Sequence, residues 1–145
     1  MYDEKSCGAV LYTYDNNILK YLLIVNQDGI YGFPKGHMEN DETEEEAALR
    51  EIYEEVGIKA HFMNNFKEYD AYRLFSKEKN KEVYKQVIYF LSDFNKKDIV
   101  KQDEEITSYS IVTYEEAISL IQAESSRNIL TKANQFILNK CNKIY

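Results

Sequence analysis

Apolar and aromatic residues recur along this chain in short runs separated by polar turns, a pattern that predicts β-strands joined by loops. The first two runs cover residues 6–14 and 20–25, and Asp15-Asn16-Asn17 between them has the composition of a tight turn. We therefore predict a β-hairpin in this part of the chain. Further strands are predicted over residues 58–63, 66–75, 82–94 and 109–112.

The strand predicted over residues 82–94 differs from the others because its apolar run, Val87–Leu91, is uninterrupted. A strand with one face in water alternates apolar and polar residues, whereas a strand covered on both faces does not. The run therefore predicts a strand buried on both sides.

Two capping boxes mark the starts of helices. Thr43 precedes Glu46 by three residues, and Gly57 has the position of a residue that ends a helix. Thr113 and Glu116 repeat this spacing and predict a helix that ends near residue 122. A last helix is predicted over residues 126–139. Helices placed between and after the strands predict an α/β fold in which helices cover both faces of a sheet.

The first predicted helix is unusually acidic on one flank. Ala48, Leu49, Ile52 and Val56 share the flank expected to face the core. The opposite, solvent-facing flank carries Glu51, Glu54 and Glu55. Side chains at this spacing lie about 5–6 Å apart at Cβ, so their like charges repel unless a cation binds them. Carboxylate oxygens on an open face favour Mg²⁺, with Mn²⁺ as the alternative.

Composition limits the partners of the chain. With 145 residues, 44% of them hydrophobic, it has the size of one domain with a core. The net charge of −7 and the isoelectric point near 4.9 argue against general nucleic-acid binding and against anionic membranes. No apolar run has transmembrane length, and the first residues lack the regions of a signal peptide. We therefore expect a cytoplasmic protein.

The spacing around the acidic helix resembles the Nudix box, G-x5-E-x7-R-E-U-x-E-E-x-G-U, where U is aliphatic. Gly36, Glu42 and residues 50–58, REIYEEVGI, match every fixed position. The resemblance implies a Nudix-type α/β/α sandwich with a mixed sheet, formed by a single domain over residues 1–145. It implies metal binding and catalysis by the residues that match the box, with Glu42 and Arg50 as a structural pair. The implied metal ligands are Gly36, Glu51, Glu54 and Glu55, of which Glu54 and Glu55 are also catalytic.

A wider resemblance points to one branch of that family. Residues 32–37, GFPKGH, with Glu39 two positions later, are similar to the signature of the diadenosine tetraphosphate hydrolases. Residues 7–10, 85–91 and 134–138 also match at corresponding places. The resemblance implies hydrolysis of dinucleoside polyphosphates, in which water attacks diadenosine tetraphosphate at phosphorus to give ATP and AMP. The positions where the branch often carries tryptophan hold Tyr31 and Ile111, so the contacts to the nucleobases differ.

Several residues outside the box are candidates for contact with the substrate. Lys35 and Lys85 are predicted to bind phosphates, and His37 either donates to the same phosphates or has a structural role. Aromatic stacking on adenine is assigned to Tyr84 and Phe136. Alignment with the family places Glu105 as general base or additional metal ligand, with its neighbour Glu104 as the alternative.

Other functions remain open at this point. An enzyme of the same class would remove pyrophosphate from the 5′ end of RNA or hydrolyse another nucleotide. A different class is a nucleotide-sensing module without turnover, which should have lost carboxylates of the box, whereas this chain has all of them. The chain is expected to act as a monomer or a dimer.

Overall fold

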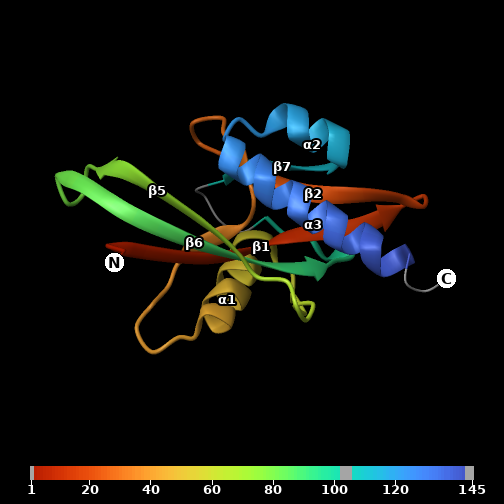
Figure 1. Cartoon of the computed structure of the whole chain (residues 1–145), viewed down its shortest axis with the longest axis horizontal. Helices are drawn as coiled ribbons and strands as arrows, with labels where there is room; N and C mark the ends of the chain where they lie inside the picture. Colours follow the sequence, from red (N-terminus) through yellow and green to blue (C-terminus); the bar gives the residue numbers. More distant parts are fainter. Residues whose placement is uncertain (1, 102–105, 143–145) are drawn as a thin grey trace.

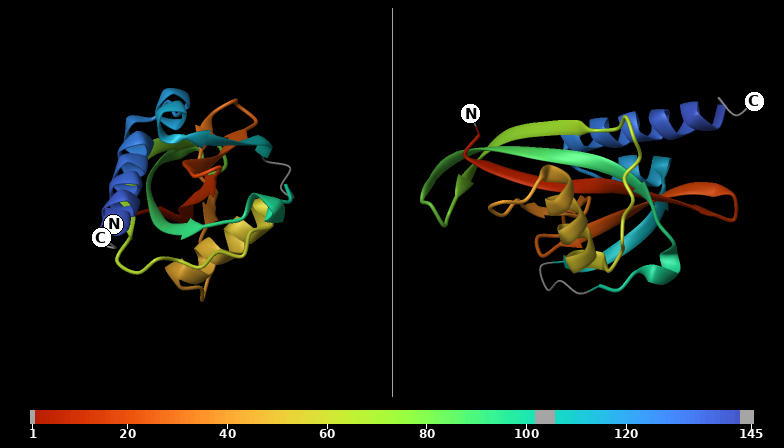
Figure 2. Two further views of the ribbon diagram at one scale, coloured as in Figure 1. Left: turned by 90° about the vertical axis from the view of Figure 1, so that its right-hand side faces the viewer. Right: turned by 90° about the horizontal axis from the view of Figure 1, so that it is seen from below.

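The computed structural model describes residues 2–101 and 106–142, and side chains up to residue 140. It contains a sheet that lies between α1 on one face and α2 and α3 on the other (Figure 1). A view from the side shows the same three layers (Figure 2). The strands are β1 (Glu4–Asp15), β2 (Ile18–Asn26), β3 (Tyr31–Gly32), β4 (Lys35–His37), β5 (Glu68–Ser76), β6 (Lys81–Asp93) and β7 (Ile106–Thr113). The helices are α1 (Glu44–Val56), α2 (Tyr114–Leu120), α3 (Glu124–Asn142) and the short 3₁₀ helix η1 (Lys96–Asp98).

The sheet is mixed and is organised around β1. The strand order is β3-β2-β1-β6-β5, with β4 paired to β1 and β7 paired to β2. β1 is parallel to β6, and the other pairs are antiparallel. The first half of β1 pairs with β4 and the second half with β2, so β4 enters the sheet where β2 has left it. This change of partner brings residues 35–37 beside the middle of the sheet.

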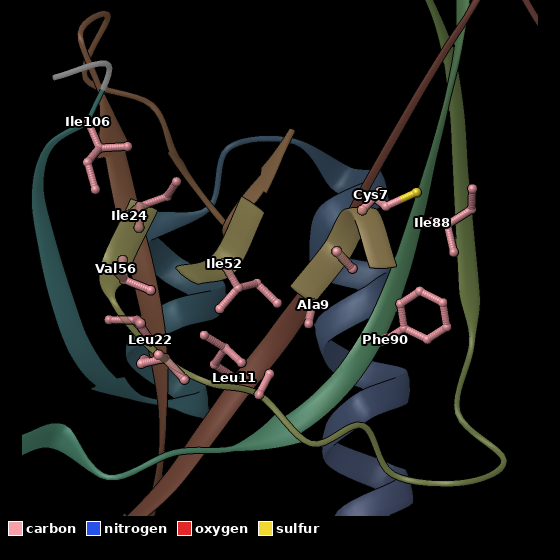
Figure 3. Close-up of a cluster of buried hydrophobic side chains, with 14 residues drawn as sticks. Cys7, Ala9, Leu11, Leu22, Ile24, Ile52, Val56, Ile88, Phe90 and Ile106 are labelled. Carbon is pink, nitrogen blue, oxygen red and sulfur yellow. The ribbon is translucent and has the colours of Figure 1, made fainter. Parts of the chain in front are cut away.

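Successive side chains of β1 point to opposite faces of the sheet and so divide the core into two parts. Cys7, Ala9 and Leu11 pack with Ile52 and Val56 of α1 (Figure 3). The even-numbered neighbours point to the opposite face, where Val10 packs with residues of α2 and α3. β6 alternates in the same way, and all residues from Val87 to Leu91 are buried. The prediction of a strand covered on both faces is therefore confirmed.

Local signals in the sequence predicted several elements correctly. The predicted hairpin is formed by β1 and β2, with Asn16 and Asn17 at φ 52° and 67° in its turn. Both capping boxes are present, at Thr43 and at Thr113. Gly57 ends α1 in the left-handed conformation at φ 75°, and its N–H donates to the carbonyl oxygen of Tyr53.

Other expectations were wrong. Residues 58–63 form no strand; within this segment the N–H of His61 donates to the Ser92 hydroxyl, and that of Met63 donates to the carbonyl oxygen of Leu91. Ile58, Ala60 and Phe62 pack in the core on the α1 side, and Met63 packs against the core on the other face of the sheet. Leu49 is 37% exposed, and Ala47 takes its place on the buried flank. In the part of the chain that the structure describes, no helix is long and apolar enough to cross a membrane.

Candidate active site

Gly36 lies against the carboxylate of Glu51. β4 places this glycine opposite Cys7, on the face of the sheet that α1 covers. A Cβ atom built on Gly36 would overlap the carboxylate carbon and both carboxylate oxygens of Glu51. A glycine is therefore required here because the helix carboxylate occupies the space of a side chain. The Gly36 backbone and the Glu51 carboxylate form one edge of the candidate site.

Arg50 connects the loop after β4 to α1. It holds Glu42 through two bonds, from Nε to Oε2 at 2.6 Å and from Nη2 to Oε1 at 3.0 Å. Its Nη1 donates to Glu51 Oε1 at 2.9 Å and lies 3.3 Å from Glu54 Oε2. Nη2 also donates to the carbonyl oxygen of His37 at 3.0 Å. One guanidinium thus fixes the loop and offsets the repulsion between carboxylates of α1.

The paired Arg50 lowers the pKa of Glu42, and the backbone N–H of Glu39 adds to the effect. The hydrogen bonds that Arg50 donates to Glu42 raise the pKa of Arg50 in turn. Because the pKa of Glu42 is lower in the folded state, its contribution to stability is present above the unfolded pKa of about 4.3. That contribution is lost as the pH falls through the folded pKa.

We therefore expect acid to destabilise the wild type more than a Glu42→Gln variant. The measurement is the urea midpoint at neutral pH and at about pH 3.5, compared between the two proteins. Glu45→Gln is the matched control because Glu45 is an exposed glutamate three residues later, in the first turn of α1. An equal acid-induced loss of stability in wild type and Glu42→Gln would contradict the assignment.

The three carboxylates of α1 differ in burial. The side chains of Glu54 and Glu51 are 55% and 15% exposed, whereas Glu55 is only 5% exposed as a residue. The expectation that all three stand on a solvent-facing flank is therefore wrong for Glu55. Its Oε1 accepts a hydrogen bond from the backbone N–H of Lys35 at 2.8 Å. The carboxylate of Glu55 is thus positioned by the strand that also carries Gly36.

The carboxylate oxygens of α1 have the chemistry of ligands for a divalent metal in an open site. Among the described residues, no group of three or more His, Cys, Asp or Glu side chains is arranged to hold a metal ion. Glu51 and Glu54 instead share Arg50, so a bound ion would compete with this guanidinium for them. Mg²⁺ usually takes one or two carboxylates and completes its octahedron with water and substrate phosphate. The Glu51 carboxylate lies against Gly36, and Glu55 accepts a hydrogen bond from the N–H of Lys35, so carboxylates of α1 adjoin β4 and offer the oxygen ligands that such an ion takes.

A cleft of about 360 Å³ opens on the other side of β4. Its lining comes from the segment around β3 and β4, from β5 and from the start of α3, and it includes Tyr31, Lys35, Asp70, Tyr72 and Ser125. The hydroxyl of Ser125 donates to Asp70 Oδ2 at 2.9 Å, which ties α3 to β5. Lys35 thus contacts both faces of β4. Its backbone N–H donates to Glu55 on the α1 side, and the residue lines the cleft on the other side.

Two predicted phosphate-binding residues are brought together here. Burial lowers the pKa of Lys35, while the carboxylates of Glu55 and Asp70 oppose this shift. Burial also lowers the pKa of Lys85, and the nearby charge of Lys35 lowers it further. The two lysines therefore interact across β1, which separates their strands. An anion between them would relieve the repulsion.

In the described part of the chain, the other residues predicted to contact the substrate do not line this cleft. The Tyr84 ring contacts Arg73 and Tyr2, at 4.8 and 4.7 Å between centres, on the face of β6 opposite Lys85. Phe136 packs edge-on against Phe66 at 5.5 Å and is absent from the lining of the cleft. The side chain of His37 is exposed. Glu104 and Glu105 lie outside the described residues.

Asp70 and Tyr72 were not predicted from the sequence as site residues, although both line the cleft. They are two positions apart in β5 and therefore lie on the same face of the strand. The signal that could have indicated them is their i, i+2 spacing in a predicted strand, which places an acidic and an aromatic side chain on one face. The strand register also places this face beside a predicted phosphate-binding residue, because Tyr72 pairs with Lys85.

Comparison with known proteins shows the family to which the chain belongs. The NUDIX domain family model matches residues 5–133. The asymmetrical bis(5′-nucleosyl)-tetraphosphatase of Rattus norvegicus is 30% identical over 92% of this chain and 95% of its own length. The corresponding protein of Sus scrofa is also 30% identical, with the same coverage.

Solved structures show the same fold. The binary complex of C. elegans Ap4A hydrolase superposes with a TM-score of 0.83 at 25% identity and covers 94% of this chain and 98% of that protein. The NUDIX domain of Shewanella oneidensis NrtR, crystallised with ADP ribose, has a TM-score of 0.73 at 16% identity over 94% and 90% of the two chains. The second match shows the fold alone.

Proposed function

Because this chain belongs to the Nudix family, we propose that it hydrolyses dinucleoside polyphosphates and cleaves diadenosine tetraphosphate asymmetrically to ATP and AMP. The observation that carries the proposal is the double contact of Lys35. Its N–H fixes the Glu55 carboxylate, and its side chain lines the adjoining cleft with a second lysine nearby. A site of this kind joins a metal-binding face to a binding place for a chain of phosphates.

The metal we propose is Mg²⁺, with Mn²⁺ as a substitute, held by Glu51, Glu54, Glu55 and the carbonyl of Gly36. When bound, such an ion neutralises phosphate charge and lowers the pKa of a coordinated water. The protein's own part is to hold the carboxylates in place, which Arg50 and the N–H of Lys35 do through the bonds described above. We further propose Glu105 as the general base.

The lysines bind the substrate in this proposal. Lys35 and Lys85 offer two point charges to the phosphates on the cleft side of β4. Tyr31 and Tyr72 line the same cleft and are assigned to nucleobase contact in place of Tyr84 and Phe136. This assignment follows from their place in the cleft, whereas Tyr84 and Phe136 contact other aromatic and basic side chains.

The test is incubation of the purified protein with a panel of nucleotides and Mg²⁺, followed by identification of the products by mass. We expect ATP and AMP from diadenosine tetraphosphate, with faster turnover than on nucleoside triphosphates or capped nucleotides. Preferential release of pyrophosphate from 5′-triphosphorylated RNA would favour the runner-up activity. Tight binding without turnover in excess Mg²⁺ would instead indicate a sensing module.

A further inference from the structure

Ser6 is a buried serine whose hydroxyl has no partner. It lies in β1, is 1% exposed, and its Oγ is the buried side-chain atom for which the described part of the chain offers no hydrogen bond. A buried hydroxyl without a partner costs about 1–3 kcal/mol relative to a satisfied one. Unsatisfied groups that persist in a folded protein require an explanation, and a ligand-dependent role is one.

The register of the sheet shows what surrounds this hydroxyl. Cys7 and Ala9 point towards α1 (Figure 3), so Ser6 points to the other face, on which the cleft opens. On this face, His37 of β4 and Val87 of β6 are the direct neighbours of Ser6 across the ladders. Ser6 is therefore enclosed between two strands that each carry a lysine.

Both lysines of the cleft side are diagonal neighbours of Ser6. Lys35 pairs with Gly8, two residues after Ser6, and Lys85 pairs with Glu4, two residues before it. Diagonal neighbours on one face of a sheet are about 7–8 Å apart at the backbone, within reach of long side chains. Gly8 has no side chain, and a Cβ there would overlap the backbone of residues 34 and 35. Ser6 therefore lies between the ladder positions of the two lysines, and Glu4, which pairs with Lys85, is the acidic residue of β1 on the same face.

We propose that Ser6 is a positioning residue for a polyphosphate. In the free protein the ammonium groups of Lys35 and Lys85 repel each other and leave the hydroxyl without a partner. A phosphate bound between them draws the ammonium groups together over β1, where the Ser6 oxygen accepts a hydrogen bond from one of them. The hydroxyl therefore fixes the lysine pair in its ligand-bound position. This inference rests on the proposed function and adds a residue to it.

The test is Ser6→Ala, with the affinity for inorganic tripolyphosphate measured by calorimetry in the presence of Mg²⁺. We expect affinity to fall about tenfold, the loss of one hydrogen bond to a charged group. The melting temperature should stay equal or rise, because the substitution removes an unsatisfied hydroxyl. The KM for diadenosine tetraphosphate should rise by a similar factor while kcat changes less than about twofold. Unchanged affinity, or no binding by the wild type, would overturn the proposal.

Ser92→Ala is the matched control. Ser92 is also fully buried, but its hydroxyl donates to the carbonyl oxygen of Asp93 at 2.8 Å and accepts from the N–H of His61 at 3.1 Å. This variant should lower the melting temperature and leave tripolyphosphate affinity unchanged. If Ser6→Ala behaved in the same way, its hydroxyl would have a structural role only, and the proposal would fail.

A double-mutant cycle shows whether Ser6 acts through a lysine. The effect of Ser6→Ala on tripolyphosphate affinity should shrink in at least one of the backgrounds Lys35→Met and Lys85→Met. A full effect in both backgrounds would overturn the mechanism. Tripolyphosphate also separates this proposal from the substrate assignment. A wild type that binds tripolyphosphate through Ser6 but leaves diadenosine tetraphosphate intact would refute the proposed function and support the anion site.

Discussion

Replacement of Glu55 with glutamine is expected to lower kcat about 10²- to 10³-fold while the protein stays folded. Glutamine keeps the shape of the side chain and an oxygen that can accept from the N–H of Lys35, so the local structure is retained. It removes the negative charge that a divalent cation requires. Since the residue is only 5% exposed, loss of the charge removes a desolvation cost but also removes the attraction to Lys35, so the two effects oppose each other and the fold should be retained.

The measurements are steady-state hydrolysis of diadenosine tetraphosphate over a range of Mg²⁺ concentrations and thermal unfolding of the same samples. Glu45→Gln provides the control, because Glu45 is an exposed glutamate of α1 outside the proposed metal site. It should match the wild type in both assays. Near-normal turnover by a folded Glu55→Gln protein would exclude this carboxylate from the metal ligands.

Gly36→Ala is expected to have the second-largest effect, with kcat about tenfold to a hundredfold lower. The added methyl group would occupy the position of the Glu51 carboxylate, so this side chain must move away. Overpacking of this kind costs about 1–3 kcal/mol, and a displacement of about 1 Å at a reacting centre can cost two orders of magnitude in rate.

Two variants separate the steric effect from a general effect of alanine. Gly32→Ala, in β3, has no atom within 4 Å of the added Cβ, and its stability should equal that of the wild type. Glu51→Asp shortens the carboxylate arm, so in its presence Gly36→Ala should cost less activity than in the wild-type background. Fully additive losses would show that the methyl group and the carboxylate do not compete for space.

The elements that could be predicted from the sequence are those whose signals are local. The capping box of Thr43 and Glu46 and the left-handed Gly57 depend on residues within one turn of α1. The motif spacing also predicted that Glu42 and Arg50 form a structural pair, and the structure joins them by two hydrogen bonds. Neither inference required knowledge of the sheet.

The parts that were missed depend on distant partners. β3 and β4 contain two and three residues, too few to show the alternation of apolar and polar residues that predicts a strand. They form because they pair with β2 and β1, respectively. Tyr84 was assigned to adenine stacking as an aromatic residue beside the basic loop, yet Tyr84 and Lys85 are adjacent in β6 and therefore point to opposite faces of the sheet. The burial of Glu55 was not predicted for a similar reason. It depends on β4, whose Lys35 N–H contacts the Glu55 carboxylate, and the residue pattern of α1 contains no information about β4.

The pairing of β1 with β6 also determines when the binding face can exist. Glu4 and Lys85 are direct neighbours in the parallel ladder although roughly eighty residues of chain separate them. During synthesis the Nudix box is therefore complete well before the second lysine has been added. The lysine pair forms only when the ends of this long loop meet, and such non-local contacts are slow to form. The phosphate-facing side of the site therefore cannot assemble until the chain has been synthesised beyond Lys85.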